Sequence, residues 1–139
     1  MNFFARALLG SGRLPGAVRA EVQGEGVVYL AEGLTGSVRY HGYRAPGVWR
    51  FGAVDATAGA LVVTRRRLLV WLTGGEQKGR HLDVPLREGR PFGVTVRVGE
   101  RRLVLGYEPA TFHADRGGRV EVRFKTAEAP RIAALLGVR

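Results

Sequence analysis

The stretch GALVVTRRRLLVW, residues 59–71, carries two apolar runs separated by three consecutive arginines. Two short apolar runs joined by a charged turn are typical of antiparallel strands in a tight hairpin. Gly74 and Gly75 follow the second run and interrupt regular structure there. We therefore predict a β-hairpin at residues 61–72, and with it a protein built on a sheet.

Alternation of apolar and polar side chains extends this sheet along the chain. The clearest case is residues 119–125, where three apolar side chains alternate with four charged ones. Pro85 places its strand near a sheet edge, because proline lacks the N–H that a central strand donates. Seven or eight short strands are expected, drawn from residues 27–30, 37–43, 48–51, 61–64, 68–72, 81–86, 92–98, 102–107 and 119–125. Their spacing and Gly-rich turns predict a mainly β fold, a small antiparallel barrel or sandwich.

The N-terminal segment is predicted to form a short helix. Asn2 suits the N-cap, and the apolar side chains that share one stripe are Phe3, Phe4, Ala7 and Leu8. Residues 10–16 contain three glycines and a proline, which is typical of a linker. The expected organisation is residues 1–16 as helix and linker and residues 17–139 as the barrel, with strand-like sequence from about Ala17.

The C-terminal segment is predicted to form an amphipathic helix that covers an open end of the barrel. Thr126 suits an N-cap. Ile132, Leu135 and Leu136 then lie on one helical face, and Gly137 ends the helix.

Length and composition bound the class of protein. A chain of 139 residues suits one domain. The absence of cysteine excludes disulfides, thiolate metal sites and a cysteine nucleophile. No apolar run is long enough for a membrane span, and Arg6 and Arg13 interrupt the one segment that resembles a secretory signal. A cytoplasmic location is therefore expected.

The charge is strongly basic, with 22 Lys+Arg against 12 Asp+Glu and a net charge of +10. All but Lys78 and Lys125 of these cations are arginine. Arginine matches phosphate and carboxylate in a planar fork, which suggests an anionic partner. The alternative is a coding bias that writes arginine wherever a solvated cation is needed. Arg39, Arg97 and Arg123 lie at polar positions of strands in which apolar and polar residues alternate. These arginines therefore also indicate which side of each strand faces the outside of the barrel.

The order of antiparallel strands followed by one C-terminal helix resembles the pleckstrin-homology-like superfold, especially its bacterial, GRAM-like branch. Residues 59–71 look like the central hairpin of that family, with Thr64, Arg67 and Leu68 at the matching positions. Residues 81–86 and 119–136 are similar to the strand after that hairpin and to the final strand and helix. The resemblance implies a PH-like barrel that binds phosphoinositides or protein segments.

The lipid-binding members of the superfold use a basic loop early in the barrel. Here the segment before Ser37 offers Glu21, Glu25 and Glu32 and no basic cluster. Phosphoinositide binding is therefore not carried over from the family.

The candidate ligand site is the hairpin tip formed by Arg65, Arg66 and Arg67. Three adjacent cations could meet a phosphate group or an anionic lipid. The alternative is a solvated turn whose charges discourage edge-to-edge pairing of strands.

Candidates for catalysis and metal binding are few. Two His-x-Asp pairs occur, His81/Asp83 and His113/Asp115. Residues i and i+2 of a strand share a face, so each pair could orient an imidazole or ligate a metal. A metal site needs three or four convergent ligands, and nothing in the spacing brings the two pairs together. Neither of the two serines lies in a nucleophile elbow. We therefore expect a non-enzyme without metal or cofactor.

Nucleic-acid binding is an alternative because aromatics and arginines interleave at residues 39–44 and 49–51. Strict alternation sends Tyr40 and Tyr43 to opposite faces, so at least one belongs to the core. A further alternative is an oligomerisation domain that docks through its N-terminal helix. The leading hypothesis is a non-enzymatic PH-like module that recognises a protein segment or an anionic headgroup, with peripheral membrane contact as one form of that recognition.

Overall fold

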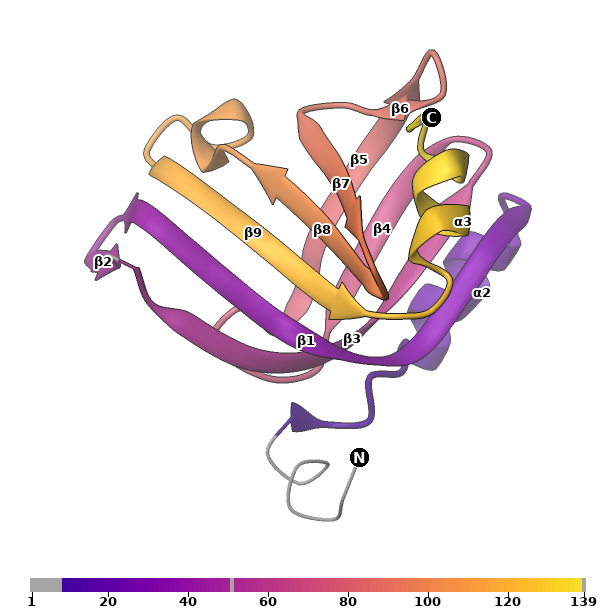
Figure 1. Ribbon diagram of the computed structural model, residues 1–139, viewed down its shortest axis with the longest axis horizontal. Helices are drawn as coiled ribbons and strands as arrows, with labels where there is room; N and C mark the ends of the chain where they lie inside the picture. Colours follow the sequence, from indigo (N-terminus) through magenta and orange to yellow (C-terminus); the bar gives the residue numbers. More distant parts are fainter. Residues whose placement is uncertain (1–8, 51, 139) are drawn as a thin grey trace.

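The computed structural model describes residues 9–50 and 52–138 (Figure 1). The strands are β1 (Val27–Ala45), β2 (Val48–Arg50), β3 (Val54–Thr64), β4 (Arg67–Leu72), β5 (Gly79–Arg87), β6 (Arg90–Pro91), β7 (Val94–Gly99), β8 (Arg102–Tyr107) and β9 (Gly117–Lys125). The helices are α2 (Gly16–Gln23), the 3₁₀ turn η1 (Pro109–Thr111) and α3 (Ala129–Leu135). The helix predicted at residues 2–9 lies outside the described residues except for Leu9.

The strands form one curled antiparallel sheet in the order β6-β5-β4-β3-β1-β9-β8-β7, and β2 pairs with the end of β1. The sheet curls into a nearly closed barrel with α3 at one end (Figure 1). The predicted fold class, a mainly β antiparallel barrel with a short C-terminal helix, is confirmed. The predicted hairpin is also present, because β3 pairs with β4 from Gly59↔Leu72 to Val63↔Leu68.

The first strand differs from the prediction. Two strands were expected, at residues 27–30 and 37–43, but β1 is one strand of 19 residues. It pairs with β3 along most of its length and with β9 in its second half. Irregular register at three points lets this strand bend around the barrel, and such bulges break the simple alternation that the prediction used.

One of these bulges also corrects the prediction for Tyr40 and Tyr43. The register against β9 shifts between His41 and Arg44, and Gly42 adopts φ 59° there. Glycine tolerates this left-handed conformation, and the extra residue turns the following side chain back toward the interior. Both tyrosines are therefore buried, with ring centroids 5.4 Å apart.

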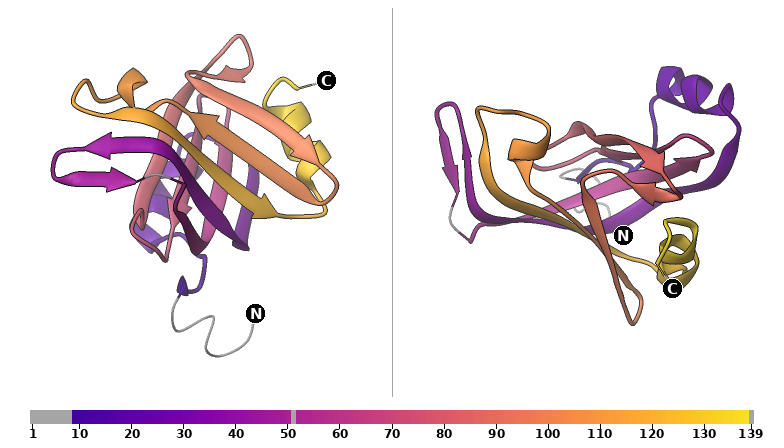
Figure 2. Two further views of the ribbon diagram at one scale, coloured as in Figure 1. Left: turned by 60° about the vertical axis from the view of Figure 1, so that its left-hand side comes forward. Right: turned by 90° about the horizontal axis from the view of Figure 1, so that it is seen from above.

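The segment after Ala17 is helical, not strand-like as predicted. Val18 and Val22, one helical turn apart, are buried in α2 and pack with Leu14, Val62 and Leu69 on the outside of β3 and β4. Figure 2 shows α2 and α3 on opposite sides of the barrel. A single pair of apolar residues between glycines is too short a pattern to distinguish a helix from a strand.

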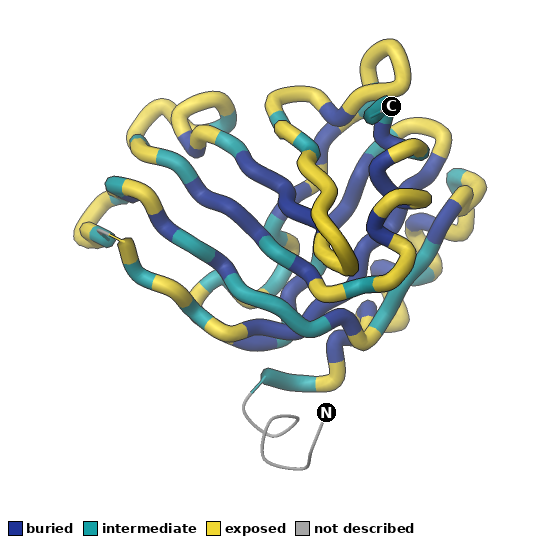
Figure 3. Tube along the Cα trace, viewed as in Figure 1, coloured by how far each residue is buried: buried dark blue, intermediate teal, exposed yellow. Residues whose placement is uncertain are grey.

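The main core fills the inside of the barrel and is completed by α3. Ile132 and Leu136 are fully buried among inward side chains such as Leu103, Leu105 and Phe124. Figure 3 shows the buried stretches running along the central strands. The helix ends at Leu135, and the predicted stop residue Gly137 follows its C-cap with φ 86°. The predicted N-cap Thr126 is wrong: the N-cap is Glu128, two residues later, and the hydroxyl of Thr126 accepts a hydrogen bond from the N–H of Glu128.

Candidate anion-binding site

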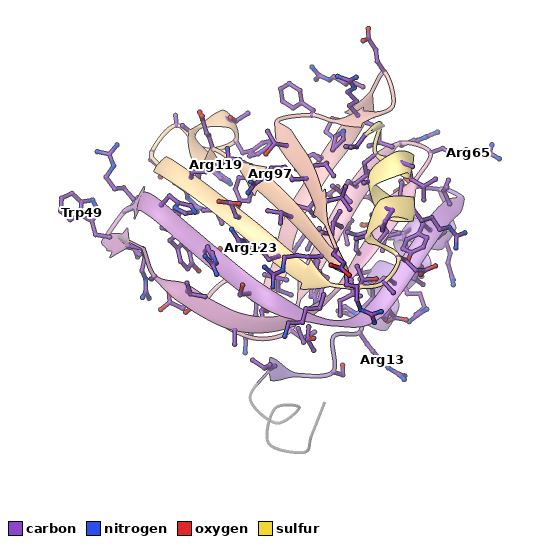
Figure 4. The ribbon with its side chains drawn as sticks, viewed as in Figure 1. Arg13, Trp49, Arg65, Arg97, Arg119 and Arg123 are labelled. Atoms are coloured by element: carbon purple, nitrogen blue, oxygen red, sulfur yellow. The ribbon has the colours of Figure 1, made fainter. Side chains whose placement is uncertain are left out.

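Arginine and lysine side chains gather on the outer face of β1, β9, β8 and β7. The inward side chains of these strands are apolar and buried, so alternation sends the cations outward. Register aligns Ser37 with Arg123 and Arg102 with Lys125 across neighbouring strands. We call this surface the basic face, and its cations are Arg39, Arg97, Arg102, Arg119, Arg123 and Lys125. Figure 4 shows Arg97, Arg119 and Arg123 over these strands.

Part of the basic face is hollowed into a groove of about 300 Å³, which we call the basic groove. Four cations line it: Arg39, Arg102, Arg123 and Lys125. The hydroxyl-bearing residues Thr35, Ser37 and Thr57 contribute to the same lining, together with Leu9, Gly36 and Phe124. Within the described part of the chain no carboxylate lines the groove. Such a surface attracts an anion by charge and offers hydroxyl groups as additional hydrogen-bond partners.

Two guanidinium groups of the groove hold buried nitrogen atoms without a protein acceptor. The Nε atoms of Arg39 and Arg123 are shielded from solvent, and no described residue accepts a hydrogen bond from them. A buried donor without an acceptor costs about 1–3 kcal/mol. An anion with several oxygen atoms, seated in the groove, would supply acceptors at a place where the protein itself offers none.

Among the described residues, Glu121 is the one carboxylate that contacts the cations of the basic face. Glu121 is almost fully buried and contacts His41 at 2.8 Å, Arg97 at 2.6 Å and Arg123 at 3.9 Å. Burial alone would raise the pKa of Glu121, but the hydrogen bond and charge of Arg97 and the charge of Arg123 outweigh burial and lower it. Glu121 therefore stays ionised and mainly neutralises Arg97, which leaves the cations of the groove in excess.

The structure separates the three arginines that the sequence singled out. Arg65 and Arg66 are exposed at the β3–β4 turn, while Arg67 folds back beneath α2. Figure 4 shows Arg65 at the end of the molecule opposite Trp49, away from the labelled arginines of the basic face. Ligand binding by this tip stays a prediction, with two of its three cations exposed.

Arg67 belongs to an ion-pair cluster that ties α2 to the sheet. Its guanidinium contacts Glu21 at 2.8 Å and Asp83 at 2.8 Å and also pairs with Glu25. Arg80 bridges the same carboxylates, at 3.1 Å from Glu21 and 2.7 Å from Asp83. Hydrogen bonds from Arg80 and Arg67 hold the pKa of Glu21 below its usual range. We call this group the Arg67 cluster.

Replacing Arg67 with glutamine is expected to destabilise the protein by about 1–3 kcal/mol, because three carboxylates lose a shared charged donor. Chemical denaturation measures the change in the free energy of unfolding. The matched control is Arg66→Gln at the neighbouring exposed position, for which the expected change is within about 0.5 kcal/mol. Equal effects of the two substitutions would mean that the Arg67 cluster does not hold α2 in place.

The fold brings three of the four residues of the His-x-Asp pairs to one pocket, which the spacing in the sequence did not predict. His81, Asp83 and His113 line one pocket, and Asp115 is not part of its lining. The carboxylate of Asp83 is engaged with Arg67 and Arg80, so it does not orient the imidazole of His81. Across the described residues, no three histidine or acidic side chains are arranged to hold a metal ion.

The aromatic residues considered for nucleic-acid stacking are mostly unsuited to it. Tyr40 and Tyr43 are buried, and the hydroxyl of Tyr40 donates to Asp55 at 3.1 Å. Trp49, in the short strand β2, is 67% exposed. Base stacking along a strand needs several exposed rings beside the cations, and the described residues of the basic face present none.

Part of the basic face was predicted from the sequence. Arg39, Arg97 and Arg123 point outward as predicted. Arg102, Arg119 and Lys125 were not singled out, although the alternation of residues 119–125 already places two of them on the same face. Their convergence depends on β1 pairing with β9, which is not visible in local sequence.

No helix in the described ranges has the length and apolar character needed to cross a membrane. Comparison with protein-family models, curated proteins and solved structures finds no match to this chain.

Proposed function

We propose that this protein is a non-enzymatic binding module whose basic groove binds ligands that carry phosphate groups. The observation that carries the proposal is the lining of the groove, with four cations and no described carboxylate. The unpaired Nε atoms of Arg39 and Arg123 support it, because phosphate presents several charged acceptors to a guanidinium fork.

We also propose membership of the pleckstrin-homology-like superfold. Its support is the succession of antiparallel strands that ends in α3, together with the hairpin of β3 and β4. The basic groove lies on β1, β8 and β9 and not on the β3–β4 tip.

The test is a calorimetric titration of the protein with inorganic pyrophosphate. The double variant Arg39→Gln/Arg123→Gln is expected to weaken binding by about tenfold or more, because two charged donors to the ligand are lost. The matched control Arg65→Gln/Arg66→Gln removes the same charge at the β3–β4 turn and is expected to leave the affinity within about twofold. Equal losses in both variants would show that net charge, and not the groove, governs binding.

Glu121→Gln gives a test with the opposite sign. This substitution removes the carboxylate that pairs with Arg97 on the basic face, so pyrophosphate affinity is expected to rise a few fold at low salt. An unchanged or lower affinity would contradict a site on this face.

A second experiment distinguishes a lipid headgroup from a free phosphate compound as the ligand. Vesicles of phosphatidylcholine with and without phosphatidic acid are pelleted with the protein, and the bound fraction is compared with the pyrophosphate titration. Binding to phosphatidic acid vesicles that pyrophosphate displaces identifies a lipid headgroup as ligand. Binding to pyrophosphate alone identifies a free phosphate compound. Absence of binding to both probes would overturn the proposed function.

A further inference from the structure

A second pocket lies where the curled sheet fails to close on itself. Among the described residues no hydrogen-bonded ladder joins β5 or β6 to β7 or β8. Side chains bridge this seam instead, since the hydroxyl of Tyr107 on β8 lies 3.0 Å from Nε2 of His81 on β5. Next to this contact is a pocket of about 430 Å³, which we call the seam pocket.

The carboxylates of the seam pocket are already engaged by arginines. Glu76 pairs with Arg50, and Asp83 contacts Arg67 and Arg80 at 2.8 Å and 2.7 Å. These contacts neutralise the acidic part of the lining.

Two cations of the seam pocket remain uncompensated. Neither Lys78 nor Arg116 has a carboxylate partner in the described part of the chain. The Nε atom of Arg116 is shielded from solvent and has no acceptor there. The pocket therefore presents an excess of positive charge, with one guanidinium donor directed at no protein group.

The imidazole and phenol at the seam are uncharged near neutral pH. Burial lowers the pKa of His81 to about 4 and raises the pKa of Tyr107 above its usual value. The contact between them is thus a neutral hydrogen bond, which neither attracts nor repels an ion strongly. The charge selectivity of the pocket then rests on Lys78 and Arg116.

Three aromatic side chains form part of the walls of the seam pocket. Tyr43, Tyr107 and Phe112 contribute rings to the lining, and the centroids of Tyr107 and Phe112 lie 6.0 Å apart. Aromatic rings pack well against other flat rings in offset or edge-to-face arrangements. A volume of about 430 Å³ is within the range of small-molecule sites.

We infer that the seam pocket binds a small aromatic carboxylate, with the carboxylate on Arg116 and Lys78 and the ring against Tyr107 and Phe112. One guanidinium and one ammonium group provide donors for the two oxygen atoms of a carboxylate. The aromatic side chains of the lining favour a ligand that carries a ring over a bare phosphate ion. This site is independent of the basic groove.

The three histidines of the chain provide reporters that separate the two sites. His81 and His113 line the seam pocket, whereas His41 contacts Glu121 on the basic face. Benzoate, titrated and followed by NMR of the imidazole signals, is expected to shift the signals of His81 and His113 and to leave that of His41 unchanged. Acetate and benzamide are the comparison probes, since one lacks the ring and the other lacks the charge.

Arg116→Gln is expected to weaken benzoate binding by about tenfold or more, and Lys78→Gln by a smaller factor. The matched control is Arg119→Gln, which removes the same charge on the basic face and is expected to change benzoate binding by less than about twofold. Because Lys78 is exposed, its variant keeps the test valid if Arg116→Gln disturbs folding.

Three outcomes would overturn the inference: equal binding of benzamide and benzoate, equal binding of acetate and benzoate, or shifts confined to His41. Since pyrophosphate tests the basic groove and benzoate the seam pocket, either proposal can fail while the other stands.

Discussion

Replacing Gly36 with alanine is expected to destabilise the barrel by about 3 kcal/mol or more. Gly36 lies in β1 between Thr57 of β3 and Phe124 of β9. A Cβ atom at this position would stand 1.7 Å from the carbonyl oxygen of Arg123 and 3.0 Å from the Cα of Phe124. These neighbours are backbone atoms, which cannot rotate away. The strands β1 and β9, which pair in the middle of the sheet, would therefore have to move apart.

The control for this substitution is Gly16→Ala. Gly16 begins α2, and a Cβ atom there meets nothing within 4 Å. Alanine also favours the helix over glycine, so this variant is expected to be as stable as the natural protein or slightly more so. Denaturant unfolding compares the two. A Gly36→Ala variant as stable as Gly16→Ala would show that β1 and β9 do not approach each other so closely.

Stability is expected to fall by roughly 2–3 kcal/mol as the pH is lowered from 6.5 to 4, because of His81. Burial lowers the pKa of His81 from 6.5 to about 4 in the folded protein. In this interval the unfolded chain binds a proton that the folded protein does not, so acid favours unfolding. The stabilisation is complete above pH 6.5 and is lost progressively toward pH 4.

Two variants identify the origin of this slope. His81→Gln lacks the titrating ring and is expected to flatten the dependence of the free energy of unfolding between pH 6.5 and 4.5. Tyr107→Phe removes the hydrogen-bond partner but keeps the burial, and it is expected to retain the slope. Below about pH 4.5 a further loss is expected in all variants, because Glu32 and Glu121 have a lowered pKa in the folded protein. An unchanged slope in His81→Gln would assign the acid sensitivity to other groups.

The elements that were predicted correctly are those whose pattern is local. The hairpin of β3 and β4 buries nearly every residue over two short apolar runs, and β9 alternates apolar and charged side chains. Both patterns are visible in a short stretch of sequence. The long strand β1 was divided in two because its bulges interrupt the period. The helix α2 was missed because its buried face consists of only Val18 and Val22.

The candidate sites depend on contacts between distant parts of the chain, which local patterns do not contain. Arg67 looked like a solvated or ligand-binding cation, but Glu21 and Glu25 reach it from more than forty residues earlier. Arg39 and Arg123 were assigned to the outside of the barrel, yet their shared groove exists only because β1 pairs with β9. Likewise, His81 and His113 come to one pocket through the curvature of the sheet.

The pairing of β1 with β9 also affects the order in which the chain can fold as it is synthesised. The hairpin of β3 and β4 joins neighbours in the sequence and can form early, whereas β9 follows β1 only after some seventy further residues, an interval of about 4–14 s at ribosomal speed. Until then the second half of β1 exposes one unpaired edge, with Ser37, Arg39 and His41 beside it. Charged and polar side chains along such an edge discourage pairing with other nascent chains. The cations proposed to bind a ligand in the finished barrel would thus also protect the unfinished one from aggregation.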